Sequence, residues 1–210
     1  KAAVVVAPTL KAAAARKLSE SLAALGATGK ADEIVKVPGA GIAAAPLVVA
    51  VGLGAGPWTE ERLRRAAGEA ARALAGTRRA VVVLPHDGPA ALDAVVQGLL
   101  LGAYDFAEYR SDSKAGHSPV GRITLHVGDA KDAETLAAVS RGRTIAESVN
   151  LARDLVNTPA DDLVPADFAA VALAQAEALG LGIEVLDENA LEDQGDVGIL
   201  AVGNYATHPP

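Results

Sequence analysis

Cysteine is absent from the 210 residues of this sequence. Disulfide bonds and zinc sites built on thiolates are therefore excluded, and the composition is compatible with a reducing cytosol. Methionine is absent too, and because the chain begins with Lys1 we expect the natural N-terminus to lie upstream. The C-terminal residues AVGNYATHPP begin in an apolar, strand-like run, and we interpret the end of the chain as a cut through a domain.

Aromatic side chains are scarce, at 3% of the chain, although half of all residues are hydrophobic. Alanine supplies much of that apolar content, so large anchoring side chains are few. We therefore expect a core made of many small aliphatic contacts, with helix backbones that approach one another closely.

Basic residues are outnumbered by acidic ones, which gives a net charge of −7. This balance argues against a general affinity for nucleic acid, because such binding depends on Lys and Arg neutralising phosphates. No apolar run approaches the roughly 18 residues of a membrane span, and the run at residues 4–7 is too short for a signal peptide. We expect a cytoplasmic protein with no membrane partner.

Apolar runs without alternation predict buried parallel strands at residues 2–7, 47–53 and 80–84. Shorter strands are expected at residues 34–37 and 122–127. Helical patterns lie between them at residues 11–25, 59–75 and 89–104, and Thr59 is placed to cap the second of these helices. The alternation predicts an α/β fold with a central, mostly parallel sheet flanked by helices.

A long helix is predicted at residues 133–156, after a polar stretch at 111–122 that should be an exposed, mobile loop. A narrow stripe along this helix consists of Ala138, Gly142, Ile145, Val149, Ala152 and Val156. The small residues of this stripe should pack against the preceding elements. The helix itself, about 36 Å long, is long enough to join two domains. A further helix at 165–179 and short strands at 183–186 and 199–202 should follow.

The segment NLARDLVNTPADDLVPADFA, residues 150–169, gathers several carboxylates into a short span: Asp154, Asp161, Asp162 and Asp167. They could form a catalytic carboxylate site or mark the boundary between two helices. Asn157 and Pro159 suit a helix end, and Pro165 and Asp167 suit the first turn of the next helix. We favour the structural interpretation, with Phe168, Val171, Ala172 and Leu179 on the buried face of that helix.

Three glycines, Gly52, Gly54 and Gly56, follow a predicted strand and precede a helix, where backbone amides can hold a phosphate. Pro57 occupies the position of the last glycine in a dinucleotide fingerprint, and the acidic residue expected downstream is missing. A tight turn is therefore the favoured interpretation, with a nucleotide site as the alternative.

His86 and Asp87 follow another strand, at the usual place for functional groups in α/β proteins. They could form a general-base pair, but no local motif fixes a nucleophile, and a solvated loop is favoured. The other histidines, His117, His126 and His208, have no metal-ligand spacing between them. No residue of this chain is assigned as catalytic, cofactor-binding or metal-binding.

Four blocks of the sequence resemble the leucyl (cytosol) aminopeptidases, peptidase family M17, in the order found in that family. They are VGLG with RRAAGEAARAL, then GLLLGAYDFAEYRSD, ARDLVNTPADDLVPADFA and GILAVGNYATHPP. Two departures stand out. Asn204, Tyr205 and Ala206 replace an expected Gln-Gly-Ser, and Val164 replaces a Thr that would cap the following helix better.

The resemblance implies a macro-like N-terminal domain at residues 1–132, a linker helix at 133–157, and the beginning of the catalytic domain at 158–210. The whole enzyme would be a hexamer that removes N-terminal, preferably apolar, residues from peptides with two zinc or manganese ions. The metal ligands of the family lie beyond the segment aligned with Pro210, so the resemblance implies that these 210 residues bind no metal and are inactive alone.

Two other functions remain open from the sequence. The chain could be a stand-alone α/β module for a nucleotide or ADP-ribose that uses the turn at residues 52–56. It could also be an assembly or regulatory domain. For the aminopeptidase fragment, we expect the first structural unit to end near Lys131 and a second unit to begin near Pro159. The second unit is too small to bury its own apolar faces unless further chain covers it.

Overall fold

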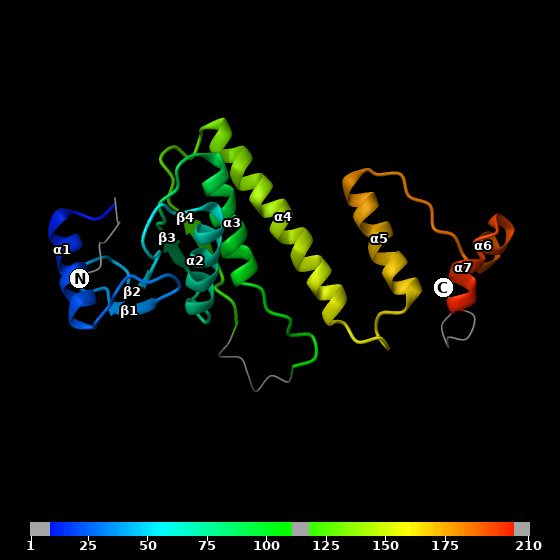
Figure 1. The fold of residues 1–210 in the computed structure, drawn as a ribbon, viewed down its shortest axis with the longest axis horizontal. Coiled ribbons are helices and arrows are strands. Elements are labelled where there is room, and N and C mark those ends of the chain that lie inside the picture. The colour runs from blue at the N-terminus through cyan, green and yellow to red at the C-terminus, as the bar shows by residue number, and fades with distance from the viewer. Residues whose placement is uncertain (1–8, 111–117, 204–210) are drawn as a thin grey trace. The chain divides into compact units, whose positions relative to one another are not determined.

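A computed structural model describes residues 9–110 and 118–203. The chain divides into two compact units, Lys1–Asn150 and Leu151–Pro210, and the division falls inside a long helix (Figure 1). Unit 1 contains all the strands that the structure describes, so the mixed α/β character predicted from the sequence resides there.

A hairpin and one helix form the first part of unit 1. Strands β1 (Ile34–Pro38) and β2 (Leu47–Val51) pair antiparallel, with Val37 opposite Val48. Helix α1 (Ala12–Ala24) buries Leu18 and Leu22 in a cluster shared with Val37 of the hairpin. The expected helix at 11–25 and strand at 34–37 are confirmed.

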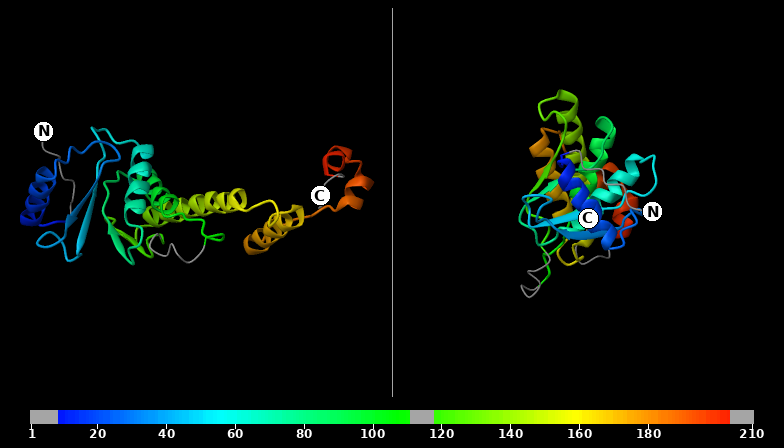
Figure 2. Two further views of the ribbon diagram at one scale, coloured as in Figure 1. Left: turned by 90° about the horizontal axis from the view of Figure 1, so that it is seen from below. Right: turned by 90° about the vertical axis from the view of Figure 1, so that its left-hand side faces the viewer.

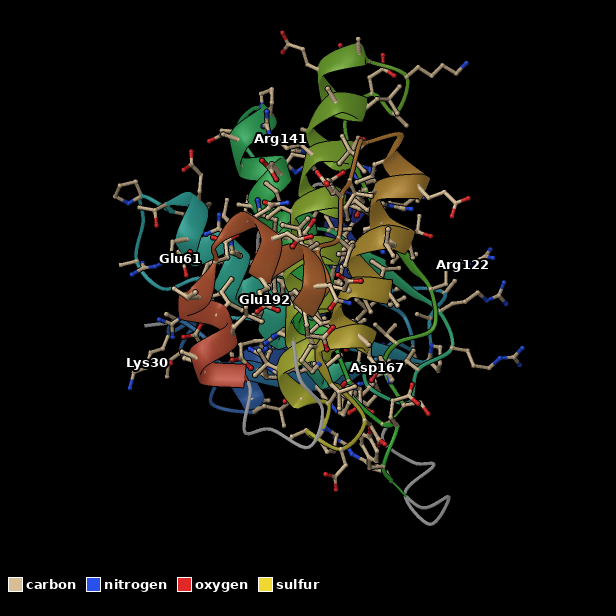
Figure 3. All side chains as sticks on the ribbon, turned by 90° about the vertical axis from the view of Figure 1, so that its right-hand side faces the viewer. Lys30, Glu61, Arg122, Arg141, Asp167 and Glu192 are labelled. Atoms are coloured by element: carbon tan, nitrogen blue, oxygen red, sulfur yellow. The ribbon has the colours of Figure 1, made fainter. Side chains whose placement is uncertain are left out.

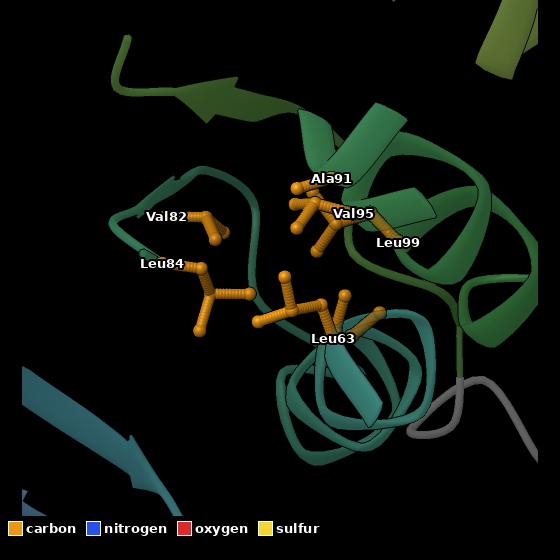
Figure 4. Close-up of a cluster of buried hydrophobic side chains, with 8 residues drawn as sticks. Leu63, Val82, Leu84, Ala91, Val95 and Leu99 are labelled. Atoms are coloured by element: carbon orange, nitrogen blue, oxygen red, sulfur yellow. The ribbon is translucent and has the colours of Figure 1, made fainter. Parts of the chain in front are cut away.

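A second core lies between a parallel pair of strands and two helices. Strands β3 (Ala80–Val82) and β4 (Ile123–Leu125) are joined through helix α3 (Pro89–Gly102), and helix α2 (Glu60–Ala73) packs on α3. Figure 4 shows apolar side chains of α2, α3 and the segment at residues 82–84 pointing toward one another. The buried members of this cluster are Leu63, Ala67, Ala71, Val82, Leu84, Ala91, Val95 and Leu99.

The predicted single, mostly parallel sheet is wrong for the strands that the structure describes. They form two separate two-stranded sheets, and β2 pairs antiparallel with β1. The connection between β1 and β2, residues 39–46, is too short for the crossover that parallel pairing requires. The predicted strand at residues 2–7 lies outside the described residues.

Helices α2 and α3 approach so closely that glycine is required at their contact. A Cβ atom on Gly98 would overlap the carbonyl oxygen of Arg64 and lie 2.8 Å from Cβ of Ala67. A Cβ atom on Gly102 would lie 2.6 Å from Cα of Gly68. The close backbone approach expected from the small-residue composition is thus confirmed.

Helix α4 (Ala133–Asn157) contacts α3 through small residues and one polar cluster. Ala138 and Gly142 are buried, as predicted, and a Cβ atom on Gly142 would lie 2.8 Å from the carbonyl oxygen of Asp93. The buried stripe continues at Ala146. The rest of the predicted stripe is wrong, because its members are exposed: Ile145, Val149, Ala152 and Val156. Helix α3 thus contacts both α2 and the first part of α4, and these helices can be followed in Figures 1 and 2.

Polar side chains link these three helices. Arg141 of α4 donates to the carboxylate of Asp93 at 2.7 Å, and Gln97 donates to the same carboxylate at 2.8 Å (Arg141 is labelled in Figure 3). Arg64 of α2 donates to the amide oxygen of Gln97 at 3.1 Å. Because Asp93 is buried, these donors compensate the desolvation of its carboxylate.

Unit 2 contains the end of α4 and helices α5 (Pro165–Leu179), α6 (Glu188–Gln194) and α7 (Val197–Gly203). Helix α5 has the predicted bounds, and Gly180 ends it in the left-handed conformation. The strand predicted at 199–202 is wrong, because these residues belong to α7; residues 183–186 form neither helix nor strand. Short apolar runs do not distinguish strand from helix without a pairing partner.

Few apolar side chains of unit 2 are buried. Among its described residues only Ala176 and Leu191 belong to the buried hydrophobic set. Phe168 is 56% exposed and Leu179 is 68% exposed, which contradicts their predicted burial on α5, while Val171 and Ala172 are half-buried. The expectation that this unit cannot bury its own apolar faces is confirmed. In the described part of the chain, no helix has the length and apolarity needed to cross a bilayer.

Candidate functional site

The two loops that follow β2 and β3 enclose an open cavity of about 440 Å³ in unit 1. Its lining comes from residues 57–60 and Leu63 on one side, and from residues 85–87 and Ala91 on the other. His86 and Asp87, singled out from the sequence, therefore lie in a cavity at the ends of two strands. The three glycines after β2 precede the lining but do not form part of it.

The glycine turn is built for backbone packing. The amide of Gly52 donates to the carbonyl of Glu33 at 2.7 Å, and the amide of Gly54 donates to the carbonyl of Gly29 at 2.9 Å. A Cβ atom on Gly52 would overlap the carbonyl oxygen of Lys30. Since two of the three amides already have acceptors, the turn is poorly suited to cradle a phosphate. This geometry supports the tight-turn interpretation over the nucleotide site.

The start of α2 adds negative charge to the cavity. Thr59 caps the helix, because its hydroxyl oxygen accepts from the amide of Arg62 at 3.3 Å, as the sequence predicted. Glu60 follows in the first turn, where a carboxylate favours the positive end of the helix. Together with Asp87 of the other loop, Glu60 gives the cavity two carboxylates.

The imidazole of His86 is oriented by its own loop. Its Nδ1 lies 3.0 Å from the carbonyl oxygen of Leu84. A carbonyl can only accept, so this contact places the proton of the hydrogen bond on Nδ1. This hydrogen bond goes to the backbone and not to Asp87, so the general-base pair considered from the sequence has no direct support.

The other histidines do not add to a site. His126 follows β4, and its amide donates to the carbonyl of Val82 at 2.9 Å, which extends the strand pairing. Its side chain is exposed. His117 and His208 lie outside the described residues.

The carboxylates of residues 150–169 behave as helix-boundary residues. Asp154, Asp161, Asp162 and Asp167 are all exposed. The carboxylate of Asp167 accepts from the amide of Val164 at 3.1 Å, which caps α5 from its first turn (Figure 3). The amide of Asp162 donates to the carbonyl of Pro159 in the turn between helices. Helix α4 includes Asn157 as its last residue, so Asn157 is not the left-handed cap that the sequence suggested.

No metal centre is formed by the residues that the structure describes. Among them, no group of three or more His, Asp or Glu side chains lies close enough to hold an ion. The described residues therefore do not fit the metal pair that the family resemblance implies.

Glu33 is a structural carboxylate that the sequence analysis missed. It accepts from the amide of Thr28 at 3.0 Å and from the amide of Gly29 at 2.5 Å, in the loop that also contacts the glycine turn. The Thr28 amide is the main cause that lowers the pKa of the Glu33 carboxyl below its ordinary value, and burial partly opposes this. No sequence motif marks this contact, because a single Glu before a strand is common.

Replacing Glu33 with Gln should destabilise unit 1 at neutral pH. A lowered pKa in the folded state means that the carboxylate stabilises the fold above its unfolded-state pKa, and this contribution is lost as the pH falls through the folded-state pKa. The stability difference between wild type and Glu33→Gln should therefore shrink below about pH 4. Urea unfolding from pH 3 to pH 7 measures this difference. Glu20→Gln, an exposed change on α1, is the control, and a difference for Glu33→Gln that does not vary with pH would contradict the prediction.

Sequence comparisons find two domains of one family in order along the chain. The N-terminal domain of the cytosol aminopeptidase family matches residues 2–113, and its catalytic domain matches residues 150–210. A "Probable cytosol aminopeptidase" of Streptomyces avermitilis is 45% identical over 199 residues, covering 89% of this chain and 39% of the relative. A protein of the same description from Corynebacterium diphtheriae is 44% identical, covering 90% of this chain and 37% of the relative.

Two solved structures are similar to this chain over most of its length. The bottromycin maturation enzyme BotP in complex with Mn matches with a TM-score of 0.77 and 31% identity, over 90% of this chain and 40% of that chain. A tomato leucine aminopeptidase mutant matches in fold, with a TM-score of 0.77 and 22% identity, over 92% of this chain and 39% of that chain. The chain thus spans about 40% of the length of the relatives that it matches.

Proposed function

We propose the function of the whole protein from its family membership. The chain belongs to the cytosol aminopeptidase family, because the N-terminal and catalytic domains of that family match it in this order along the sequence. The whole protein is then a metal-dependent aminopeptidase that removes N-terminal residues, preferably apolar ones, from peptides. The main support for this proposal is the 45% identity to a probable cytosol aminopeptidase over 89% of this chain.

Within that enzyme, residues 1–132 are the macro-like N-terminal domain and residues 133–157 are the linker helix. Residues 158–210 begin the catalytic domain. This assignment is supported by the second family match, which starts at residue 150, and by the exposed apolar side chains of unit 2. Those side chains are what a domain shows when the rest of its core is contributed by further chain.

The metal ions of the proposed enzyme are zinc or manganese, held outside the described residues. The manganese in the BotP structure supports a divalent metal in this family. A hexamer acting in the cytoplasm completes the proposal, with oligomer contacts made through the catalytic domain. No step of peptide hydrolysis is assigned to a described residue, because the described residues offer no metal cluster.

The test compares two proteins on a leucyl anilide with added manganese. The 210-residue chain should show no turnover above a metal blank, and a protein that extends it to the full length of its relatives should turn the substrate over. Chelation should abolish the second activity, because water activation in such a site depends on the metal. Turnover by the 210-residue chain would contradict the placement of the metal site, and an inactive full-length protein with manganese and with zinc would contradict the function.

A further inference from the structure

The parallel strands β3 and β4 have one covered face and one uncovered face. The covered face carries Val82 and Leu84, which are buried in the cluster shared with α2 and α3. Side chains alternate between the two faces of a strand, so Val81 lies on the opposite face, where it is 73% exposed. Its partner on β4, Thr124, is also exposed. We call this opposite side the outer face of the β3–β4 pair.

An uncovered face is unusual for parallel strands. Parallel sheets are normally covered by helices on both faces, whereas antiparallel sheets commonly leave one face in water. The buried cluster places α2 and α3 on the covered face, and the exposure of Val81 shows that no described residue packs over the centre of the outer face. The outer face is therefore a surface on which a further helix is expected to pack.

The outer face is positively charged where the two strands begin. Arg79 and Arg122 directly precede β3 and β4, and the amide of Ala80 donates to the carbonyl of Arg122 at 2.9 Å (Arg122 is labelled in Figure 3). Both arginines are exposed, and the ion pairs found among the described residues involve neither of them. Like charges on neighbouring strands repel, so a partner that brings a carboxylate is favoured here.

The chain itself contains a segment of the opposite charge. Residues 151–210 contain eleven Asp and Glu residues and a single Arg, and because the whole chain has a net charge of −7, residues 1–150 are net positive. Helix α5 combines this acidity with apolar side chains that remain exposed within unit 2, namely Phe168, Leu173 and Leu179. Unit 2 therefore has an acidic and apolar surface that complements the outer face.

Two residues of α5 match the outer face in spacing as well as in chemistry. Leu173 and Glu177 are both exposed and lie one helical turn apart, about 6 Å along the helix axis. Val81 and Arg79 are two residues apart in an extended strand, about 7 Å. A leucine placed on the valine therefore brings the carboxylate of Glu177 to the guanidinium groups at the start of the strands.

We propose that the outer face of the β3–β4 pair is an interaction surface for helix α5 of a second copy of this chain. The contact buries Val81 against Leu173 and pairs Glu177 with Arg79 and Arg122. It goes beyond the proposed function, because it requires no peptidase activity. In the proposed oligomer it adds a surface of the N-terminal domain to the contacts between copies.

Sedimentation velocity of the 210-residue chain tests this contact. The wild-type chain should associate as its concentration rises, and high salt should weaken the association, because salt screens exposed charges. Arg79→Glu/Arg122→Glu should raise the dissociation constant about tenfold, because attraction at the contact becomes repulsion. Arg16→Glu/Lys36→Glu is the matched control, since it changes the net charge equally at exposed positions of α1 and β1. Its dissociation constant should stay close to that of the wild type.

An exchange of charges identifies the partner surface. Glu177→Lys alone should also weaken the association, because it places a lysine opposite Arg79 and Arg122. An equimolar mixture of Glu177→Lys and Arg79→Glu/Arg122→Glu should associate again, since each contact between the two variants joins opposite charges. Circular dichroism checks that every variant folds.

Three results would overturn the proposal: a wild-type chain that stays monomeric at every concentration and salt, equal weakening by the outer-face variant and its control, or a mixture of variants that stays monomeric. A monomeric wild-type chain would assign the outer face to a partner other than this chain. None of these measurements involves catalysis, so a negative result leaves the proposed peptidase function standing.

Discussion

Replacing Gly98 with Ala is expected to lower the free energy of unfolding of unit 1 by about 3 kcal/mol. The added Cβ atom would overlap the carbonyl oxygen of Arg64 on the facing helix. The carbonyl belongs to the backbone of α2 and the Cβ atom is bonded directly to the backbone of α3, so relief requires the two helices to separate along a contact that shares the apolar core. Gly102→Ala should have a similar effect, because its Cβ atom would meet the backbone of Gly68.

Helix propensity alone would predict the opposite, a gain in stability, because it favours Ala over Gly by about 1 kcal/mol. Gly68→Ala supplies the matched control at the same contact, because its Cβ atom would have its nearest neighbour, the carbonyl oxygen of Gly98, at 3.4 Å. That variant should be neutral or stabilising. Urea unfolding followed by circular dichroism and Trp58 fluorescence measures all three, and equal stability of Gly98→Ala and Gly68→Ala would contradict close backbone packing.

Hydrogen exchange should differ by at least about a thousandfold between the two units of the 210-residue chain. Amides of residues 197–202, in α7, should exchange fast, because α7 has no buried residue and Val197 and Val202 are more than half exposed. Amides of β2 and of the buried centre of α3 should exchange slowly, because they lie in hydrogen-bonded elements against apolar clusters.

Mass spectrometry of the exchanging chain measures this contrast, and the comparison with the full-length protein is its control. If further chain covers unit 2, protection of residues 197–202 should rise in the longer protein while protection of β2 stays the same. Equal protection of α7 and β2 in the 210-residue chain would show that it is a complete fold. The fragment interpretation would then be wrong.

Helices were predictable because their ends carry local chemistry. Thr59, Pro89 and Gly180 each satisfy a requirement of a helix terminus within a few residues, so the bounds of α2, α3 and α5 follow closely from the sequence. The family could also be identified, because its blocks occur in order. The pairing of the strands was harder to predict. The sequence shows that β2 is apolar, but it does not show that β2 pairs with β1.

Only one side of the candidate cavity could be predicted from the sequence. His86 and Asp87 follow a strand, which is a recognisable position, but Trp58 and Glu60 join them only through the packing of α2 on α3. The glycine turn next to Trp58 was seen in the sequence, yet its acceptors come from residues 29–33. Contacts of this kind depend on tertiary structure, and sequence spacing does not reveal them.

The adjacent residues Arg141 and Gly142 set the rotational phase of α4. Gly142 lets the helix lie against the backbone of Asp93, while Arg141 reaches the carboxylate of the same residue. A residue inserted into α4 between Ala138 and Arg141 would turn the preceding part of the helix by about 100° and remove Ala138 from its buried position. An insertion in the segment between β4 and α4 would not rotate α4 relative to α3. Length variation among relatives should therefore accumulate before Ala133 and avoid the residues between Ala138 and Ala146.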